Sequence, residues 1–313
     1  MTQKMSVFVV GFCCLIFVLA GHAPAQAAEP AAPSTQGQSA APEQPSNLTL
    51  WNFFTEGWSQ EWTHRVTPGG APDMSLLHVQ TNFLEREFRF DSYYQENLSN
   101  DSNKGTYFTD ALVAYGINRR FMVEVVTNYE WKDLKGSPTQ DGAGGALLGR
   151  FQLVDIPGSS YAFNVRVSAP NSGIGLQETE FTSSIAGWND LTPLGLKRVG
   201  LYYSIQEDTY TGPAAKGSRR NDLLYDVSLA KTWTEKNTPL LGNFTTFVEL
   251  YSTTNLDGPG REQGLPYTVV NVTPAIHLNL TRNNVLMFGV DFPVSNPHDF
   301  GKTYRLTYVY DFE

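Results

Sequence analysis

Cysteine is nearly absent from this chain, and the two that occur, Cys13 and Cys14, are adjacent and close to the N-terminus. The rest of the chain therefore lacks the means to form a disulfide framework or to use a thiolate nucleophile. Basic residues are also scarce, because 22 Lys and Arg stand against 31 Asp and Glu, for a net charge of −9. Without a basic patch, nucleic acid is excluded as a partner.

A long apolar run is missing as well. Beyond the N-terminus no apolar stretch reaches the roughly 18 residues of a spanning helix, which excludes a helical membrane protein. The one apolar run, residues 7–20, is shorter than that, follows Lys4, and precedes the small-x-small site Ala25-Gln26-Ala27. These features predict a cleaved signal peptide over residues 1–27, and they disfavour an uncleaved membrane anchor.

Two segments precede the main domain. Residues 28–47 are rich in Ala, Pro, Gln and Ser, have no hydrophobic period, and are expected to form a disordered linker. In residues 48–66, Phe54, Trp58 and Trp62 recur every four positions, which predicts a short amphipathic helix. Such a helix would plug the domain, cap it, lie in a membrane interface or bind a partner.

The C-terminal residues show the clearest pattern in the chain. From Lys302 onward, apolar and aromatic side chains alternate with polar ones, so that Leu306 and Tyr308 share one face and Arg305 and Thr307 the other. A strand of this kind that follows a signal peptide is typical of an outer-membrane β-barrel, whose apolar face meets lipid and whose polar face meets the lumen. The mean hydropathy of −0.28 agrees, because the two faces cancel.

The same alternation recurs through residues 75–313. We predict an all-β, antiparallel up-and-down transmembrane barrel of about twelve strands of roughly ten residues each. The first strand is expected at 76–94, with a β-bulge near Phe83 and Leu84, where the alternation changes phase. The others are expected near 105–117, 120–132, 143–154, 160–169, 177–188, 198–211, 221–234, 243–254, 268–280, 284–294 and 302–313.

The lengths of the connections predict which end of the barrel faces the periplasm. Asn118-Arg119, residues 156–159 and Arg282-Asn283 are short and suit the periplasmic end. Residues 97–104, 132–142, 210–220 and 255–264 are longer, rich in Gly, Pro, Asn and Asp, and suit the extracellular end.

The polar face predicts the lining of the lumen. Its candidate residues are mixed in charge with an acidic excess, which favours cations, although polar side chains that merely fill a barrel give the same pattern. They are Asp110, Glu124, Asn128, Arg150, Asn164, Arg166, Glu180, Asp208, Asp226, Glu249, His277, Asp291 and Arg305.

Other chemistry has little support in the sequence. The glycines at 142, 144, 145 and 149 are not followed by the Lys-Ser/Thr of a phosphate-binding loop, and no pair of histidines has metal-ligand spacing, so neither cofactor nor metal is expected. His78 and His277 leave one alternative open, a lipid hydrolase of the outer membrane.

Three segments carry a family resemblance. They are Tyr107 to Asn118, which ends in Tyr-Gly-Ile-Asn, Arg120 to Tyr129, and Trp188-Asn-Asp-Leu191. On these segments, residues 75–313 resemble the outer-membrane barrels of the family named for the meta-pathway of phenol degradation. The resemblance implies a transporter-like channel linked to uptake of aromatic or hydrophobic compounds, and it carries no catalytic residues.

Together these observations predict a porin-like channel in the outer membrane of a Gram-negative bacterium, for passive uptake or efflux of small solutes, hydrophobic or aromatic ones included. Its partners would be outer-membrane lipid, periplasmic chaperones, the barrel assembly machinery and a small-molecule solute. The alternatives are the lipid hydrolase, a structural or adhesion barrel with a filled lumen, and a soluble periplasmic β protein.

Overall fold

A computed structural model describes residues 47–63, 74–97, 103–134, 140–169, 179–211, 220–235, 238, 241–257, 268–296 and 300–312. The predicted signal peptide and nearly all of the predicted linker lie outside these residues. Within them, no helix is both long and apolar enough to cross a membrane.

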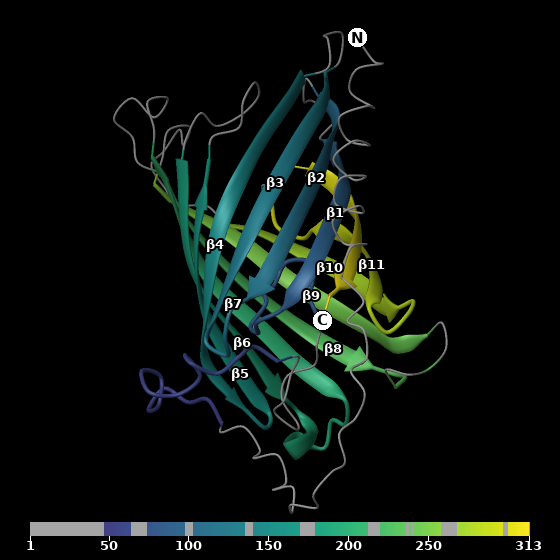
Figure 1. The fold of residues 1–313 in the computed structure, drawn as a ribbon. Coiled ribbons are helices and arrows are strands. Elements are labelled where there is room, and N and C mark those ends of the chain that lie inside the picture. The colour runs from purple at the N-terminus through teal and green to yellow at the C-terminus, as the bar shows by residue number, and fades with distance from the viewer. Residues whose placement is uncertain are drawn as a thin grey trace, which may run out of the picture. The chain divides into compact units, whose positions relative to one another are not determined.

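The described chain forms a closed barrel of twelve antiparallel strands (Figure 1). Each strand pairs with its neighbours in sequence, and β1 pairs with β12 to close the sheet. This confirms the predicted fold. The strands are β1 (Arg86–Asn97), β2 (Asn103–Gly116), β3 (Phe121–Leu134), β4 (Gln140–Ile156), β5 (Ser159–Ser168), β6 (Thr179–Asp190), β7 (Val199–Thr211), β8 (Arg220–Thr232), β9 (Gly242–Asp257), β10 (Thr268–Asn279), β11 (Asn284–Pro293) and β12 (Phe300–Asp311).

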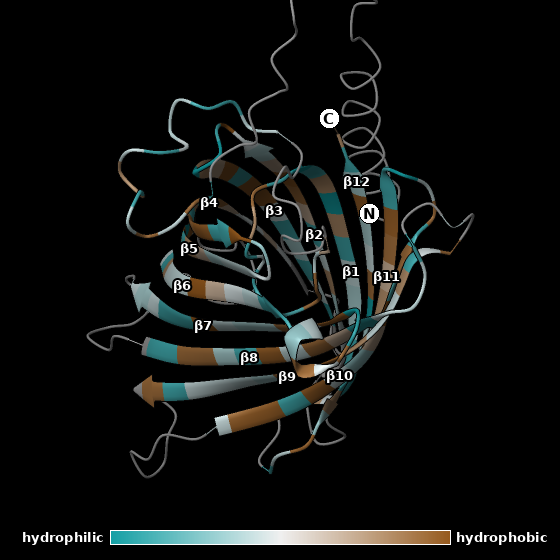
Figure 2. Cartoon of the chain, turned by 90° about the horizontal axis from the view of Figure 1, so that it is seen from below, coloured by the Kyte–Doolittle hydropathy of each residue, from teal (hydrophilic) through white to brown (hydrophobic). Residues whose placement is uncertain are grey.

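The alternation in the sequence explains why these segments form one closed layer. In β10, Pro274 and Ile276 are more exposed, whereas Thr273, Ala275 and His277 between and beside them are buried. Bands of hydrophobic and hydrophilic residues follow one another along the strands (Figure 2). The exposed side chains are apolar in the middle of many strands, for example Val125, Leu147 and Ile205. An apolar outer face around a polar inner face is the arrangement that a lipid bilayer stabilises.

The connections differ in length between the two ends of the barrel. The β2–β3, β4–β5 and β10–β11 connections are short, and Gly158 adopts a φ of 79° in the tight turn between β4 and β5. The β6–β7 connection is longer and contains the 3-10 turn η1 (Thr192–Leu194). We refer to the end with these connections as the short-turn end; β1 starts there and β12 ends there.

The first predicted strand is wrong over its N-terminal half. β1 begins only at Arg86, and residues 74–85 belong to no strand. They run through the interior of the barrel, where they contact residues of several strands. The phase change near Phe83 and Leu84 marks the end of this interior segment rather than a bulge. The segment bends at residues 77–79, so the sequence alternation of His78, Gln80 and Asn82 does not correspond to a strand here.

The predicted amphipathic helix is also wrong over the described residues 47–63. Residues 51–55 form a hydrogen-bonded turn, with the amide of Glu56 donating to the carbonyl oxygen of Asn52, and Gly57 then breaks it with a φ of 88°. Isolated bridges hold both ends of the segment against the barrel, Leu48 to Asp155 and Glu61 to Asn118. A helix of this length gains little on its own, so these contacts decide the conformation.

Candidate functional site in the barrel interior

Residues Met74–Glu85, here called the inner segment, are held by side chains from opposite walls of the barrel. The backbone amides of His78 and Val79 donate to Oε1 of Glu249 on β9, at 3.3 and 3.2 Å. The amide of Gln80 donates to the hydroxyl of Ser204 on β7 at 3.3 Å. A segment whose backbone is hydrogen-bonded to side chains on several strands is a fixed part of the interior.

The carbonyl groups of the inner segment are satisfied in the same way. The carbonyl oxygen of Asn82 accepts hydrogen bonds from Nε2 of Gln152 at 3.1 Å and from the hydroxyl of Ser160 at 2.9 Å. Because Gln152 is on β4 and Ser160 on β5, this contact lies across the barrel from Glu249. The inner segment therefore crosses the lumen rather than following one wall.

Asp291 on β11 is the centre of the first charged cluster. Its carboxylate contacts Nε2 of His78 at 3.1 Å and Nε of Arg305 at 2.7 Å, and it accepts a hydrogen bond from the hydroxyl of Thr273 at 2.7 Å. The ring of Tyr251 stacks on that of His78 with centroids 3.7 Å apart. A buried carboxylate with this many donors is stabilised in its charged form, and it ties the inner segment to β11 and β12.

Arg150 on β4 is the centre of the second cluster. Its guanidinium donates to Oδ1 of Asn164 at 2.8 Å, to the carbonyl oxygen of Phe83 at 2.9 Å and to Oε1 of Glu85 at 3.1 Å. Oε2 of Glu124 lies 3.7 Å from it. The planar fork of arginine reaches all these acceptors at once, so one side chain fixes the C-terminal end of the inner segment.

Apolar contacts hold the N-terminal end of the inner segment. Met74, Leu76 and Val79 are buried in one cluster with side chains of β6 to β10 that point inward. Leu77 packs where β11 has a glycine, and a Cβ added at Gly289 would lie 2.4 Å from Cδ1 of Leu77. Gly289 therefore provides the space that lets the segment approach the wall. The wall residues of the cluster are Trp188, Tyr202, Ala230, Phe247 and Ala275.

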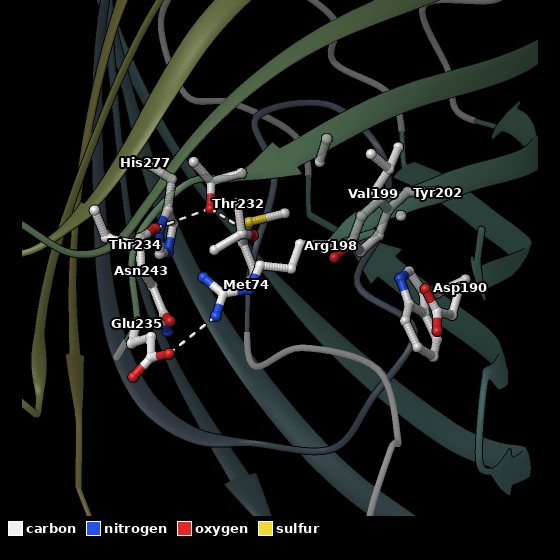
Figure 3. Close-up of a pocket in the computed structure, with 14 residues that line it drawn as sticks. Met74, Asp190, Arg198, Val199, Tyr202, Thr232, Thr234, Glu235, Asn243 and His277 are labelled. Atoms are coloured by element: carbon white, nitrogen blue, oxygen red, sulfur yellow. Dashed lines mark hydrogen bonds and ion pairs between the residues drawn. The ribbon is translucent and has the colours of Figure 1, made fainter. Parts of the chain in front are cut away.

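A cavity of about 360 Å³ opens beside the N-terminal end of the inner segment, at the short-turn end (Figure 3). Met74, Trp188 and Tyr202 give it an apolar wall, and Thr232, Asn243 and His277 add polar groups. The buried indole Nε1 of Trp188 has no hydrogen-bond partner among the described residues. This nitrogen has almost no exposed surface and packs against Gly200, so the cavity meets the ring of Trp188 rather than its N–H group.

Backbone strain is concentrated at the same cavity. Arg198 and Asn243 are the non-glycine residues of the described chain with positive φ, at 58° and 47°, and both line it. Arg198 also forms an ion pair with Glu235 at 3.0 Å, which Figure 3 shows at the edge of the cavity. Strained residues persist where their surroundings fix them, and they are enriched at binding sites.

A second cavity, of about 270 Å³, lies along the other part of the inner segment. Its lining is charged and mixed in sign, with Arg89, Arg166 and Arg305 near Asp91 and Asp110. By contrast, Glu180, Asp208 and Asp226 follow one another on β6, β7 and β8. The hydroxyl of Thr182 donates to Asp208 at 2.7 Å and lies 3.4 Å from the carboxylate of Glu180. The interior is therefore mixed in charge on one side and acidic on the other.

The structure places the predicted lining residues on the inner face. Glu124, Arg150, Asn164, Asp208, Glu249, His277 and Asp291 are buried, and Asp110, Asn128, Arg166, Glu180, Asp226 and Arg305 are partly buried. Arg150 joins Glu124 and Asn164, and Asp291 joins Arg305, whereas His277 lies apart, at the first cavity. That these residues line a conducting path stays a prediction.

Sequence reasoning missed the inner segment as an element, and with it the roles of His78, Glu85 and Ser160. The phase change near Phe83 was the available signal. It also missed Trp188 and Tyr202, since aromatic side chains at strand ends are expected to face lipid. His78, which the sequence offers as a hydrolase histidine, contacts Asp291 and Tyr251 in the structure.

Comparison with solved structures supports the architecture. The COG4313 outer membrane channel from Pseudomonas putida F1 superposes with a TM-score of 0.55 at 10% identity, covering 77% of this chain and 100% of that chain. The chain has the fold of an outer-membrane channel. NanC porin (TM-score 0.49, 10% identity, 73% of this chain and 99% of that one) and KdgM porin (0.47, 10%, 72% and 99%) also match. No protein-family model and no curated protein matches the chain.

Proposed function

We propose that the chain forms a passive channel for small solutes in the outer membrane of a Gram-negative bacterium. The observation that carries this proposal is the closed barrel with an apolar exterior and a charged, hydrogen-bonding interior. Lipid favours the outer face, and a polar inner face offers a path that water and polar solutes share. Transport follows the concentration gradient and uses no cofactor.

The inner segment narrows this path. It is anchored through Glu249, Asp291 and Arg150 on different strands, with one cavity beside each part of it. We expect solutes to pass when the segment shifts from this position. The channel therefore conducts weakly at rest, and its conductance depends on how firmly these three residues hold.

The solutes we propose are small and include aromatic compounds. The resemblance to the phenol-degradation family suggests this class, and the first cavity suits it, because Trp188 and Tyr202 give it aromatic walls beside polar groups such as Thr232. Replacing Trp188 with Ala removes one aromatic wall. We expect weaker binding of phenol and of toluene, measured by their block of the current, because both lose the same ring contact.

The second candidate function is a structural barrel with a filled interior. The inner segment and its contacts on β4, β5, β7, β9 and β11 favour it. An enzyme is not part of either proposal, and the proposed partners remain lipid, the assembly machinery with its chaperones, and the solute.

Single-channel recording in a planar bilayer tests the proposal. Discrete current steps from protein that shows the heat-modifiable migration of a folded barrel support a channel. The filled barrel is favoured if the same folded protein gives no current steps. This result should hold for the wild type and for a variant in which the inner segment is released.

A further inference from the structure

The residues that precede the inner segment form an apolar projection at the short-turn end of the barrel. Residues Thr49–Trp58, here called the aromatic foot, expose Trp51 completely, Phe54 to 89% and Leu50 to 62%. Side chains of this size and chemistry are costly to leave in water. They are neighbours within one turn of chain, so they present a single apolar surface.

The aromatic foot is fixed to the barrel by a buried arginine. Nε of Arg120 donates to the carbonyl oxygen of Glu56 at 2.9 Å, and its Nη2 donates to the carbonyl oxygen of Thr49 at 3.1 Å and to Oδ1 of Asn52 at 2.7 Å. The remaining nitrogen, Nη1, bonds to carbonyl oxygens of β4, those of Gln152 and Leu153.

Arg120 is fully buried, between β2 and β3. Burial lowers the pKa of Arg120 to about 10, so the guanidinium is still protonated at neutral pH and keeps all its donors. A charged side chain that satisfies the backbone of the foot holds it in one position. The foot is therefore a rigid part of the barrel end rather than a free tail.

The apolar surface of the foot continues the outer face of the barrel. Trp58 packs against the ring of Phe151, which lies on β4 between the inward-facing Arg150 and Gln152 and so points outward, with centroids 6.5 Å apart. Phe151 is also the middle of a row across β3, β4 and β5, with Phe121 at 4.9 Å and Phe163 at 6.5 Å. The ring of Phe53, also in the foot, lies 5.5 Å from that of Trp58, so Trp58 is the residue that joins the foot to this row.

From this continuity we propose that the aromatic foot inserts into the lipid leaflet at the short-turn end of the barrel. Trp51, Phe54 and Leu50 enter the interfacial region of the membrane, where aromatic side chains are favoured. Trp58 marks the boundary between foot and barrel wall. A plug role is incompatible with this placement, because the foot packs on the outward face and not on the lumen.

The inference rests on the proposed membrane location, and the experiment separates the two. Cys13 and Cys14 are replaced by Ser, and single cysteines are introduced as Trp51→Cys, Phe54→Cys, Leu147→Cys and Thr63→Cys. Leu147 is an exposed apolar residue in the middle of β4, and Thr63 is an exposed polar residue beyond the foot. Each variant is labelled with an environment-sensitive fluorophore and reconstituted in phosphatidylcholine vesicles that carry bromine at acyl positions 6,7 or 11,12.

We expect labels at Trp51 and Phe54 to be quenched most by the shallow bromines, the label at Leu147 most by the deep ones, and the label at Thr63 by neither. Quenching at Leu147 without quenching at Trp51 and Phe54 would overturn the proposal that the foot inserts into lipid. The proposed membrane location of the barrel would stand. Absence of quenching at Leu147 overturns the membrane location itself. Two independent foot positions are used so that failure of one variant to fold leaves the result decisive.

Discussion

His78 of the inner segment and Asp291 of β11 are in direct contact, with Nε2 of the imidazole 3.1 Å from the carboxylate. The same carboxylate binds Arg305, so one buried acid joins the inner segment to the seam where β11 and β12 meet. The position of the inner segment in the lumen therefore depends on the negative charge of Asp291.

Replacing Asp291 with Asn is expected to loosen the inner segment. The variant loses hydrogen bonds to a charged group, worth about 1.5–3 kcal/mol each, which corresponds to at least a tenfold shift toward a released state. The measurement is the rate at which a water-soluble thiol reagent modifies Thr81→Cys, a position on the inner segment. Asp208→Asn is the control, because Asp208 bonds to Thr182 and Gln206 and not to the segment. Equal rates in the two backgrounds would contradict the anchor role of Asp291.

Linking the inner segment to the wall is expected to abolish conductance reversibly. Leu77→Cys with Gly289→Cys places two thiols where the leucine side chain meets the glycine, in a protein otherwise freed of cysteine. Oxidation should remove the current steps and a reductant should restore them, with each single-cysteine variant insensitive to both. Steps that persist through oxidation, with the disulfide verified by mass, would show that the segment does not gate the path.

Replacing Arg150 with Met is expected to destabilise the barrel. The change removes the guanidinium that contacts the buried carboxylates of Glu85 and Glu124, and breaking a buried ion pair costs about 3–5 kcal/mol. Urea-induced unfolding in detergent, followed by migration on a gel, measures the loss. Arg150→Lys is the matched variant, and it should lose less, since it keeps the charge but not the fork. Unchanged midpoints for both would show that the cluster contributes nothing to stability.

Cation preference is expected to come from the acidic wall. The double variant Glu180→Gln with Asp208→Asn removes two inward carboxylates that share Thr182. In a KCl gradient its reversal potential should move toward zero, because less negative charge faces the path. Glu207→Gln, an exposed residue next to Asp208 on the outward face, should leave the potential unchanged. A shift of the same size in that control would assign the effect to surface charge.

The strands were predictable because their cause is local. In β10 apolar and polar residues alternate over much of the strand, and the same period recurs in β11 and β12, although Val285, Met287 and Val309 occupy buried inner positions. A closed single-layer sheet places its two faces by this period. The predicted ranges from residue 105 onward therefore agree with the observed strands to within a few positions at each end.

The inner segment and the aromatic foot were not predictable, because partners far away in sequence determine them. The sequence around His78, Gln80 and Asn82 alternates as a strand does. The backbone of these residues, however, is hydrogen-bonded to the side chains of Glu249, Ser204 and Ser160 and not to a neighbouring strand. Phe54, Trp58 and Trp62 share a helical spacing by coincidence. In the structure Phe54 is exposed and Trp58 packs on Phe151. The indole Nε1–H of Trp62 donates to the carbonyl oxygen of Leu84 at 3.2 Å.

The inner segment directly precedes β1, the strand that closes the barrel against β12. Its anchors on β9 and β11 are made of residues that follow it by some 170 to 213 positions, so they exist only once the late strands are in place. The β1–β12 seam that closes the barrel and the segment that obstructs the passage are thus adjacent pieces of one chain. A chain without β9 and β11 would lack these anchors for the inner segment, so the restriction of the passage depends on the complete sheet.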